Sequence, residues 1–198
     1  MIFAGNAGTG KTNAARITFE YLNALGILSK GIYKEVSKAD FLTENSIDVA
    51  KRTIDIINSA LGGVLFVDEA YSLASNKGQG SSYNEEAIAT LIQAMENYRD
   101  NLVVIFAGYT KEMQDFLDMN SGIVSRIGYT VEFEDYTEDE LLQIFMGMMN
   151  KAGFEVTPEA QNKVRSIITE YKDTKNFGNA RFVRNVYEKS IIKHASNT

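Results

Sequence analysis

Residues 5–12 form a glycine-rich segment that ends in a lysine and a threonine. The segment consists of Gly5, Asn6, Ala7, Gly8, Thr9, Gly10, Lys11 and Thr12. It fits the pattern G-x-x-x-x-G-K-[ST] and lies between an apolar strand pattern and a helical pattern, the context that makes a phosphate-binding loop credible. Such a loop needs a strand, a tight turn and a helix in that order, which favours an α/β fold.

The chemistry of this loop follows from its residue types. Glycines let successive backbone N–H groups point at phosphate oxygens. We predict that Lys11 reaches the β and γ phosphates of ATP, that the Thr12 hydroxyl ligates Mg²⁺, and that the binding residues extend to Asn13. A glycine-rich turn that only caps a helix would not explain why a lysine and a threonine occur together where attraction for an anion is greatest.

The order of the remaining elements supports the same fold class. Short apolar runs alternate with longer segments of helical spacing, which is typical of crossover units and a parallel sheet. We predict strands at residues 1–4, 31–36, 64–67, 102–107 and 129–133. Helices are predicted at residues 11–25 and 46–61, the first stopping at Gly26, and a capping box opens a third at Ser82.

After residue 133 the strand patterns cease. A capping box at Thr137, a proline at the first helical position at Pro158, and an apolar stripe after Asn179 indicate three helices. The sequence therefore predicts a P-loop NTPase fold, with a parallel five-stranded sheet in an α/β core, residues 1–134, followed by a small all-helical lid domain, residues 135–198.

Two acids follow the apolar strand pattern at residues 64–67. Asp68 and Glu69 are then expected at the carboxyl edge of the sheet, where ligands of open α/β folds bind. An Asp-Glu pair after a strand is by itself usually a solvated turn. Together with the phosphate-binding loop it reads as a Walker B motif, in which Asp68 holds Mg²⁺ and Glu69 orients or deprotonates the attacking water.

Two arginines are candidates for the same chemistry. Arg181 lies in the first turn of a predicted helix, where a cation opposes the helix dipole and an anion should compensate. That anion is either a γ phosphate or the carboxylate of an ordinary salt bridge. Arg126 is either a surface charge or a finger that enters a neighbour's site, and the residues alone leave both alternatives open.

Composition excludes other classes of protein. The chain has 198 residues, a net charge of −6 and no cysteine. The negative charge makes nucleic-acid binding unlikely, and the lack of cysteine excludes disulfide scaffolds and thiolate metal sites. The apolar runs are far shorter than the roughly 20 residues of a membrane-spanning helix, and the chain opens without a basic leader. A cytoplasmic protein without a membrane segment is expected.

Five blocks of the sequence together resemble one family. They are residues 5–12, 64–73, 103–109, 125–128 and 178–185. In this order they resemble the CbbX/CfxQ group of AAA+ ATPases, which includes red-type Rubisco activases and the stage V sporulation protein K relatives. The resemblance covers nearly the whole chain. It implies an ATP hydrolase with a nucleotide held between core and lid, subunits in a homo-oligomeric ring that is usually a hexamer, and remodelling of a partner protein.

The resemblance also implies roles for single residues. Arg126 matches the arginine finger acting in trans, and Arg181 matches the sensor-2 arginine of the lid. Arg184, one turn later on the same helix face, is a weaker candidate for the site. With Lys11 and Glu69, the two matched arginines complete the predicted catalytic set.

The sequence departs from the family pattern in three places. The central-pore loop usually carries an aromatic, an aliphatic and a glycine, whereas this chain has Asn45-Ser46-Ile47; Phe41, the nearest aromatic, is expected to pack in the core. The sensor-1 position directly after the fourth strand is commonly a polar Asn or Thr, but here it is occupied by Tyr109. Tyr109 or the following Thr110 is therefore expected to take this role. The chain begins at the first strand, so the amino-terminal segment that helps enclose the adenine is expected to be missing.

Two further functions stay open at this point. One is a P-loop kinase that passes the γ phosphate to a small acceptor, although the acid pair favours water as the acceptor. The other is a catalytically weak ATP-binding scaffold module. A GTPase is disfavoured because no Asn-Lys-x-Asp motif occurs.

Overall fold

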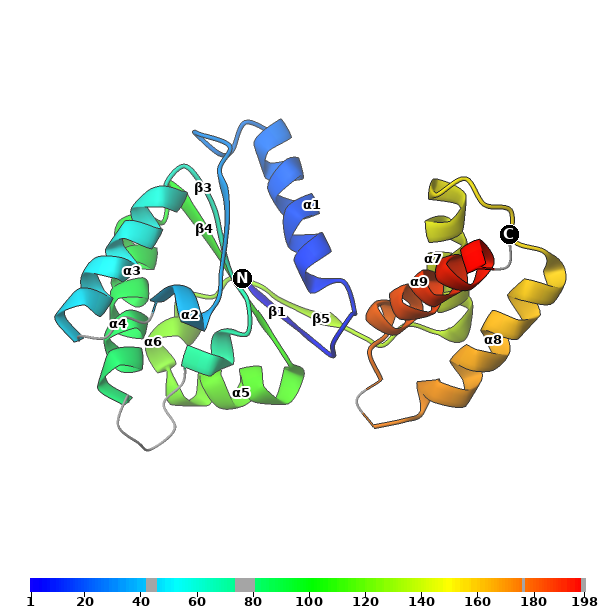
Figure 1. Cartoon of the computed structure of the whole chain (residues 1–198). Coiled ribbons are helices and arrows are strands. Elements are labelled where there is room, and N and C mark those ends of the chain that lie inside the picture. Colours follow the sequence, from blue (N-terminus) through cyan, green and yellow to red (C-terminus); the bar gives the residue numbers. More distant parts are fainter. Residues whose placement is uncertain (42–45, 74–80, 176, 197–198) are drawn as a thin grey trace. The chain divides into compact units, whose positions relative to one another are not determined.

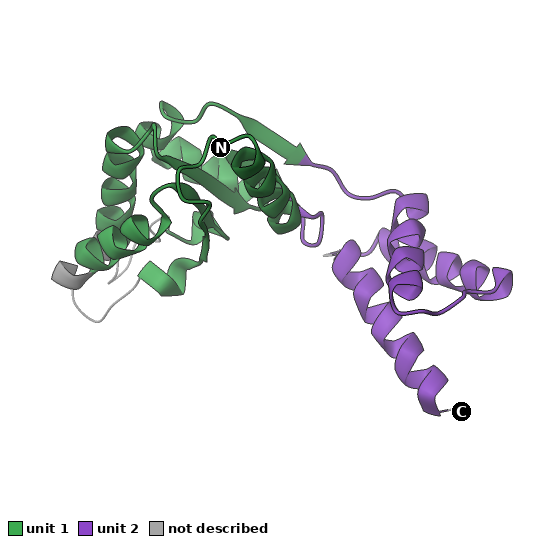
Figure 2. Ribbon diagram, turned by 90° about the horizontal axis from the view of Figure 1, so that it is seen from above, with its two compact units in different colours: residues 1–4, 11–132 green, residues 5–10, 133–198 purple. Residues whose placement is uncertain are grey.

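The computed structural model describes residues 1–41, 46–73, 81–175 and 177–196 (Figure 1). By compactness the chain forms two units (Figure 2). The first comprises residues 1–4 and 11–132, and the second comprises residues 5–10 and 133–198. The phosphate-binding loop therefore belongs to the same compact unit as the carboxyl-terminal helices.

The first unit is built on a sheet. Its strands are β1 (Ile2–Gly5), β2 (Tyr33–Val36), β3 (Gly63–Val67), β4 (Leu102–Gly108) and β5 (Thr130–Phe133). Their order is β2-β3-β4-β1-β5, and the pairs β2·β3, β3·β4 and β4·β1 are parallel. The predicted five-stranded parallel sheet is confirmed. The second strand begins two residues later than predicted, because Gly31 has a φ of +59°, which a strand does not allow.

Helices cover both faces of this sheet. They are α1 (Lys11–Ala24), α2 (Lys38–Phe41), α3 (Ser46–Ala60), the 3₁₀ helix η1 (Ala70–Leu73), α4 (Ser81–Asn97), α5 (Thr110–Met119) and α6 (Ser121–Val124). Figure 1 shows α1 on one face and α3 with α4 on the other. Gly26 has a φ of +70° and lies just beyond the end of α1, as the predicted helix stop requires.

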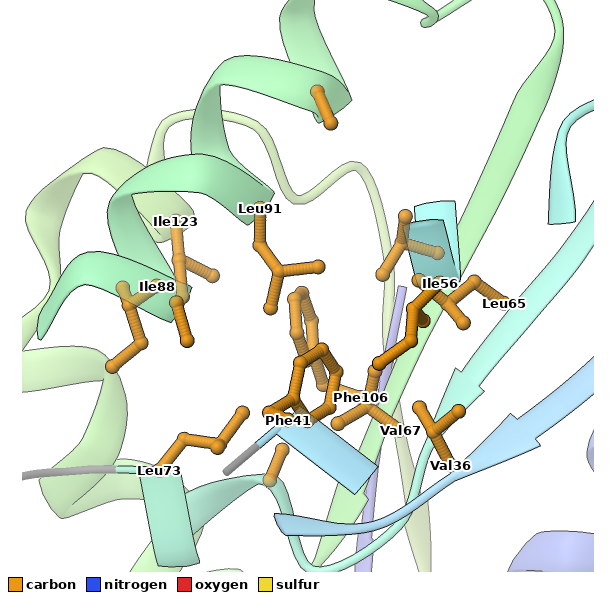
Figure 3. Packing of buried hydrophobic residues seen from close by; sticks show 14 of the residues in the cluster. Val36, Phe41, Ile56, Leu65, Val67, Leu73, Ile88, Leu91, Phe106 and Ile123 are labelled. Carbon is orange, nitrogen blue, oxygen red and sulfur yellow. The ribbon is translucent and has the colours of Figure 1, made fainter. Parts of the chain in front are cut away.

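The core lies between the sheet and the α3–α4 layer (Figure 3). Leu65 and Val67 of β3 point into this cluster, and Phe41 of α2 packs there fully buried, as predicted. Because successive side chains of a strand alternate between faces, Val64 and Phe66 lie on the α1 face, and both are fully buried as well. Burial on both faces explains why β3 is an unbroken apolar run.

The carboxyl-terminal part of the second unit is all helical. It contains α7 (Glu138–Lys151), α8 (Pro158–Lys172) and α9 (Ala180–Ser196), so the three predicted helices are confirmed. Thr137 and Glu140 form the predicted capping box, and the Thr157 side chain caps α8 just before Pro158. The apolar faces meet in a separate small core of Leu141, Phe145, Val164, Ile168 and Val183. Among the described helices, none has the length and apolar character needed to cross a bilayer.

Candidate nucleotide site

The carboxyl edge of the sheet gathers the predicted motifs of the first unit. β1 leads into the phosphate-binding loop, β3 ends directly before Asp68, and β4 ends directly before Tyr109. The register pairs Val67 with Phe106 and Ala4 with Gly108, so the three parallel strands end at the same edge. This is the edge at which open α/β sheets bind ligands.

The acid pair occupies an unusual turn. Asp68 is half-buried, and one of its carboxylate oxygens accepts a hydrogen bond from the backbone N–H of Glu69 at 3.0 Å. Glu69 has a φ of +48°, in the left-handed region that non-glycine residues seldom adopt, and its side chain is exposed. Such strain persists only where the surroundings enforce it, and it concentrates at functional sites. The turn is held by the Glu69 carbonyl, which accepts from the Ser72 N–H at 2.8 Å in η1.

Lys11 and the end of β4 are in contact. The Lys11 Nζ lies 5.7 Å from the centroid of the Tyr109 ring, within cation–π distance, and the ring of Tyr71 lies 5.8 Å from that of Tyr109. Burial raises the pKa of the Tyr71 hydroxyl to about 12, and the Glu69 carboxylate acts in the same direction. Tyr71 is therefore neutral at physiological pH. The two sensor-1 candidates differ in their surroundings. The Tyr109 ring lies within cation–π distance of Lys11, whereas Thr110 is exposed at the start of α5.

The phosphate-binding loop lies against other segments of the second unit. Gly8 and Gly10 have φ angles of +71° and +95°, the freedom for which glycine is needed here, and the Thr9 hydroxyl donates to the Asn6 carbonyl at 2.9 Å. A methyl group on Gly8 would lie 2.0 Å from the Gly178 carbonyl oxygen and 2.9 Å from the Arg181 backbone nitrogen. The structure thus brings the backbone of Arg181 next to the loop.

A methyl group at position 8 is expected to be poorly tolerated. In Gly8→Ala the left-handed backbone alone costs roughly 1–2 kcal/mol, and the contact with Gly178 adds to this. We expect a lower melting temperature in calorimetry and weakened ATP binding. Gly147→Ala is the matched control: Gly147 lies inside α7 with nothing within 4 Å of an added methyl, so alanine there should stabilise by about 0.5–1 kcal/mol. Equal melting temperatures for the two variants would contradict this account.

The two lid arginines differ in their surroundings. Arg181 is exposed in the first turn of α9, and within the described residues no carboxylate lies within salt-bridge distance of it. The sequence left two anions open as the partner of Arg181, a γ phosphate or a carboxylate of the protein. The described residues provide no such carboxylate. Arg184 instead lines a surface pocket with Lys151 of α7 and Tyr187 of α9.

Arg126 is engaged within its own chain. Its Nε lies 3.2 Å from a Glu96 carboxylate oxygen, and its guanidinium donates to the Gly122 carbonyl at 3.0 Å and to the Ser125 hydroxyl at 3.2 Å. The side chain is 30% exposed. Any action on a neighbouring subunit would therefore require it to exchange Glu96 for another partner.

The remaining predicted residues lie at the starts of helices α1 and α3 or outside the described residues. Thr12 is half-buried and Asn13 is exposed, both in the first turn of α1. For the pore-loop segment, Asn45 lies outside the described residues, and Ser46 and Ile47 begin α3. Sequence reasoning missed Asp135, Tyr136 and the side chain of Asn179, all of which contact the phosphate-binding loop. The only local signal was the Gly178-Asn179 pair, a dipeptide that tolerates positive φ.

Two family models together match nearly the whole chain. The ATPase family associated with various cellular activities (AAA) matches residues 1–135, and the AAA lid domain matches residues 137–198. The chain belongs to the AAA ATPase family. Both the α/β fold with its helical lid and the resemblance to the CbbX/CfxQ group are thereby confirmed.

Relatives of this AAA ATPase align over almost its whole length. It is 40% identical to stage V sporulation protein K of Bacillus subtilis (strain 168) over 198 residues, covering 98% of this chain and 61% of the relative. It is 39% identical over 196 residues to protein CbbX of Cereibacter sphaeroides, covering 99% of this chain and 63% of the relative. It is also 39% identical to the chloroplastic ribulose bisphosphate carboxylase/oxygenase activase of Cyanidioschyzon merolae (strain NIES-3377 / 10D), covering 99% and 67%. The chain thus spans about three fifths to two thirds of these proteins.

Solved structures agree on the fold. The crystal structure of the FIGL-1 AAA domain in complex with ADP superposes with a TM-score of 0.61 at 17% identity, covering 83% of this chain and 53% of that one. At this identity the likeness concerns the fold alone.

Proposed function

We propose that this AAA ATPase binds ATP with Mg²⁺ on its phosphate-binding loop and hydrolyses it, within a homo-oligomeric ring that remodels a partner protein. The observation that carries the proposal is the strained turn at Glu69, which presents two carboxylates at the sheet edge where Lys11 and Thr12 begin α1. Membership of the AAA ATPase family and the similarity to a Rubisco activase support ATP use and action on a protein.

The residues at this edge fit a magnesium ion. Thr12 and Asp68 are both half-buried, and their side chains offer oxygen atoms as metal ligands. Mg²⁺ is a hard cation that prefers oxygen ligands. The Asp68 carboxylate accepts one backbone N–H and keeps further acceptor positions. When bound, the ion would neutralise charge on the phosphates. Lys11 would bind the β and γ phosphates, and Glu69 would orient the attacking water and accept its proton.

Arginines would complete the site. Arg181, which has no carboxylate partner among the described residues, would bind the γ phosphate in its own subunit. Arg126 would act on the site of a neighbouring subunit. In this arrangement residues 1–134 serve as the ATPase core and residues 135–198 as the lid.

Substituting the loop lysine tests the binding step. Lys11→Ala removes a charge-assisted contact to phosphate worth roughly 1.5–3 kcal/mol, so we expect ATP affinity to fall about 10- to 150-fold. Titration with a fluorescent ATP analogue measures the change, and Lys111→Ala, an exposed lysine on α5, is the matched control. Unchanged affinity in Lys11→Ala would refute nucleotide binding at this loop.

Phosphate release tests the reaction. The wild-type protein is expected to release phosphate from ATP with no acceptor added. A kinase should release little phosphate under these conditions. Formation of ADP that depends on an added small acceptor, without matching release of free phosphate, would favour the kinase over the hydrolase.

A further inference from the structure

Asn179 is a polar residue in an unfavourable position. It is fully buried and has a φ of +46°, next to the first residue of α9. Asparagine is among the few non-glycine residues that occupy the left-handed region, but glycine would do so without strain. A buried amide must also find hydrogen-bond partners to offset its loss of water. The side chain is therefore expected to serve a purpose that glycine could not.

Both ends of the Asn179 amide are hydrogen-bonded. Its Oδ1 accepts from the Tyr136 backbone N–H at 3.0 Å, and its Nδ2 donates to a carboxylate oxygen of Asp135 at 2.8 Å and to the Ala7 carbonyl at 3.2 Å. These partners fix the orientation of the amide, because Oδ1 faces a donor and Nδ2 faces two acceptors. One side chain thus joins the start of the helical segment to the phosphate-binding loop.

Asp135 extends this connection. Its carboxylate also accepts from the Asn6 side chain, with Nδ2–O distances of 3.0 and 3.1 Å. Asn6, Asp135 and Asn179 thereby form a continuous polar chain, which we call the loop clamp. All its members belong to the second compact unit.

The clamp region holds three consecutive loop carbonyls. The Ala7 carbonyl accepts from the Asn179 side chain, the Gly8 carbonyl accepts from the Ala180 N–H at 3.1 Å, and the Thr9 carbonyl accepts from the Tyr136 hydroxyl at 3.2 Å. The C=O and N–H groups of a trans peptide point in opposite directions, and no peptide here is cis. The N–H groups of Gly8, Thr9 and Gly10 are therefore turned away from the segment that holds the carbonyls.

Successive N–H groups turned to the same side form a concavity that attracts anions. Such a concavity binds its ligand more tightly if it is formed before the ligand arrives, because ordering a glycine-rich loop during binding weakens affinity. We propose that Asn179 and Asp135 are positioning residues that pre-form the phosphate-binding face of the loop. This inference rests on the proposed nucleotide site and adds residues that act on it through the loop backbone.

Asn179→Gly separates the side chain from the backbone conformation. Glycine keeps the positive φ and removes the amide, so the turn itself should survive. We expect the affinity for a fluorescent ATP analogue to fall about tenfold, since the loop must then be ordered during binding. Without nucleotide, hydrogen exchange in peptides that cover residues 5–12 should become faster.

A control variant distinguishes positioning from loss of stability. Val183→Ala removes buried volume from the small core of the helical segment. The Val183 backbone N–H donates to the Asn179 carbonyl at 3.1 Å, a bond that alanine keeps, and the Val183 side chain makes none of the hydrogen bonds of the loop clamp. The variant should lower the melting temperature while leaving affinity and loop exchange at wild-type values. Equal effects of Val183→Ala and Asn179→Gly on affinity would overturn the proposal.

An exchange of the two side chains supplies a rescue test. Asn179→Asp alone sets two carboxylates against each other and should weaken ATP binding more than Asn179→Gly does. Adding Asp135→Asn restores an amide–carboxylate pair, so the double variant should bind at least severalfold more tightly than Asn179→Asp. Affinity of Asn179→Gly within twofold of wild type, with unchanged loop exchange, would refute the proposal. If the wild-type protein binds no ATP, the proposed function fails, while exchange in the nucleotide-free protein still decides whether the clamp orders the loop.

Discussion

Replacing Arg126 by alanine is expected to lower ATP turnover about 10³- to 10⁵-fold while ATP binding stays intact. The reason is that a guanidinium placed against the transferring phosphoryl group stabilises charge that develops in the transition state, and contributes little to the ground state. In the structure Arg126 pairs with Glu96 of its own chain at 3.2 Å and contacts none of Lys11, Asp68 or Glu69 within the described residues. Steady-state phosphate release and analogue titration measure the two effects separately.

Mixing two inactive variants tests whether the site is shared. An Arg126→Ala subunit keeps Glu69, and a Glu69→Gln subunit keeps Arg126, so some interfaces of a mixed ring combine both intact groups. At equal amounts about a quarter of interfaces would do so if mixing is random. We therefore expect activity to return on mixing and to depend on the ratio. No recovery at any ratio would contradict a shared site.

Arg99→Ala is the matched control for Arg126→Ala. Arg99 is 72% exposed and lies 3.8 Å from Glu96, the carboxylate that also pairs with Arg126. Its removal therefore perturbs Glu96 without removing the proposed finger, and turnover should stay close to wild type. A loss in Arg99→Ala as large as that in Arg126→Ala would show that the effect comes from Glu96.

Replacing Glu69 by glutamine is expected to lower turnover about 10²- to 10⁴-fold, because the amide cannot accept the proton of the attacking water. The substitution keeps the size of the side chain and leaves Lys11 and Thr12 untouched, so ATP should bind as it does to the wild type. Glu112→Gln is the control, since Glu112 is an exposed carboxylate in the first turn of α5. Background phosphate release in both wild type and Glu69→Gln would instead indicate an ATP-binding scaffold.

The parallel sheet could be predicted because its strands β1, β3 and β4 are apolar on both faces. β3 is buried at every position and β4 at nearly every one, so each is a short unbroken run of apolar residues. Two helix starts were readable, the first from the capping box at Thr137 and the second from Pro158 at the first helical position. Helix α5 was not predicted. It begins after Tyr109, which provides no side-chain cap, so the sequence lacks the usual start signal.

The loop clamp could not be predicted for a different reason. Asn179 and Ala7 are separated by 172 positions, and Asn6 and Asp135 by 129. No local pattern encodes such a pairing, and a single asparagine or aspartate next to a loop is common. The phosphate-binding loop itself was readable because its glycines, lysine and threonine are adjacent in the chain. The residues that hold the loop in place, Asp135 and Asn179, are distant from it in the sequence. From the sequence alone they could be placed only at the edges of helical segments.

The contacts of the phosphate-binding loop bear on how the protein can be dissected. A core fragment that ends at residue 134 would carry the loop but lack the donors from Tyr136, Asn179 and Ala180. A separate helical fragment would in turn expose the Asn179 amide, which is buried in the intact chain. Two-hybrid baits, crystallisation fragments or split reporters cut after residue 134 would therefore be impaired on both sides of the cut. The phosphate-binding loop and the lid are better handled as one inseparable piece.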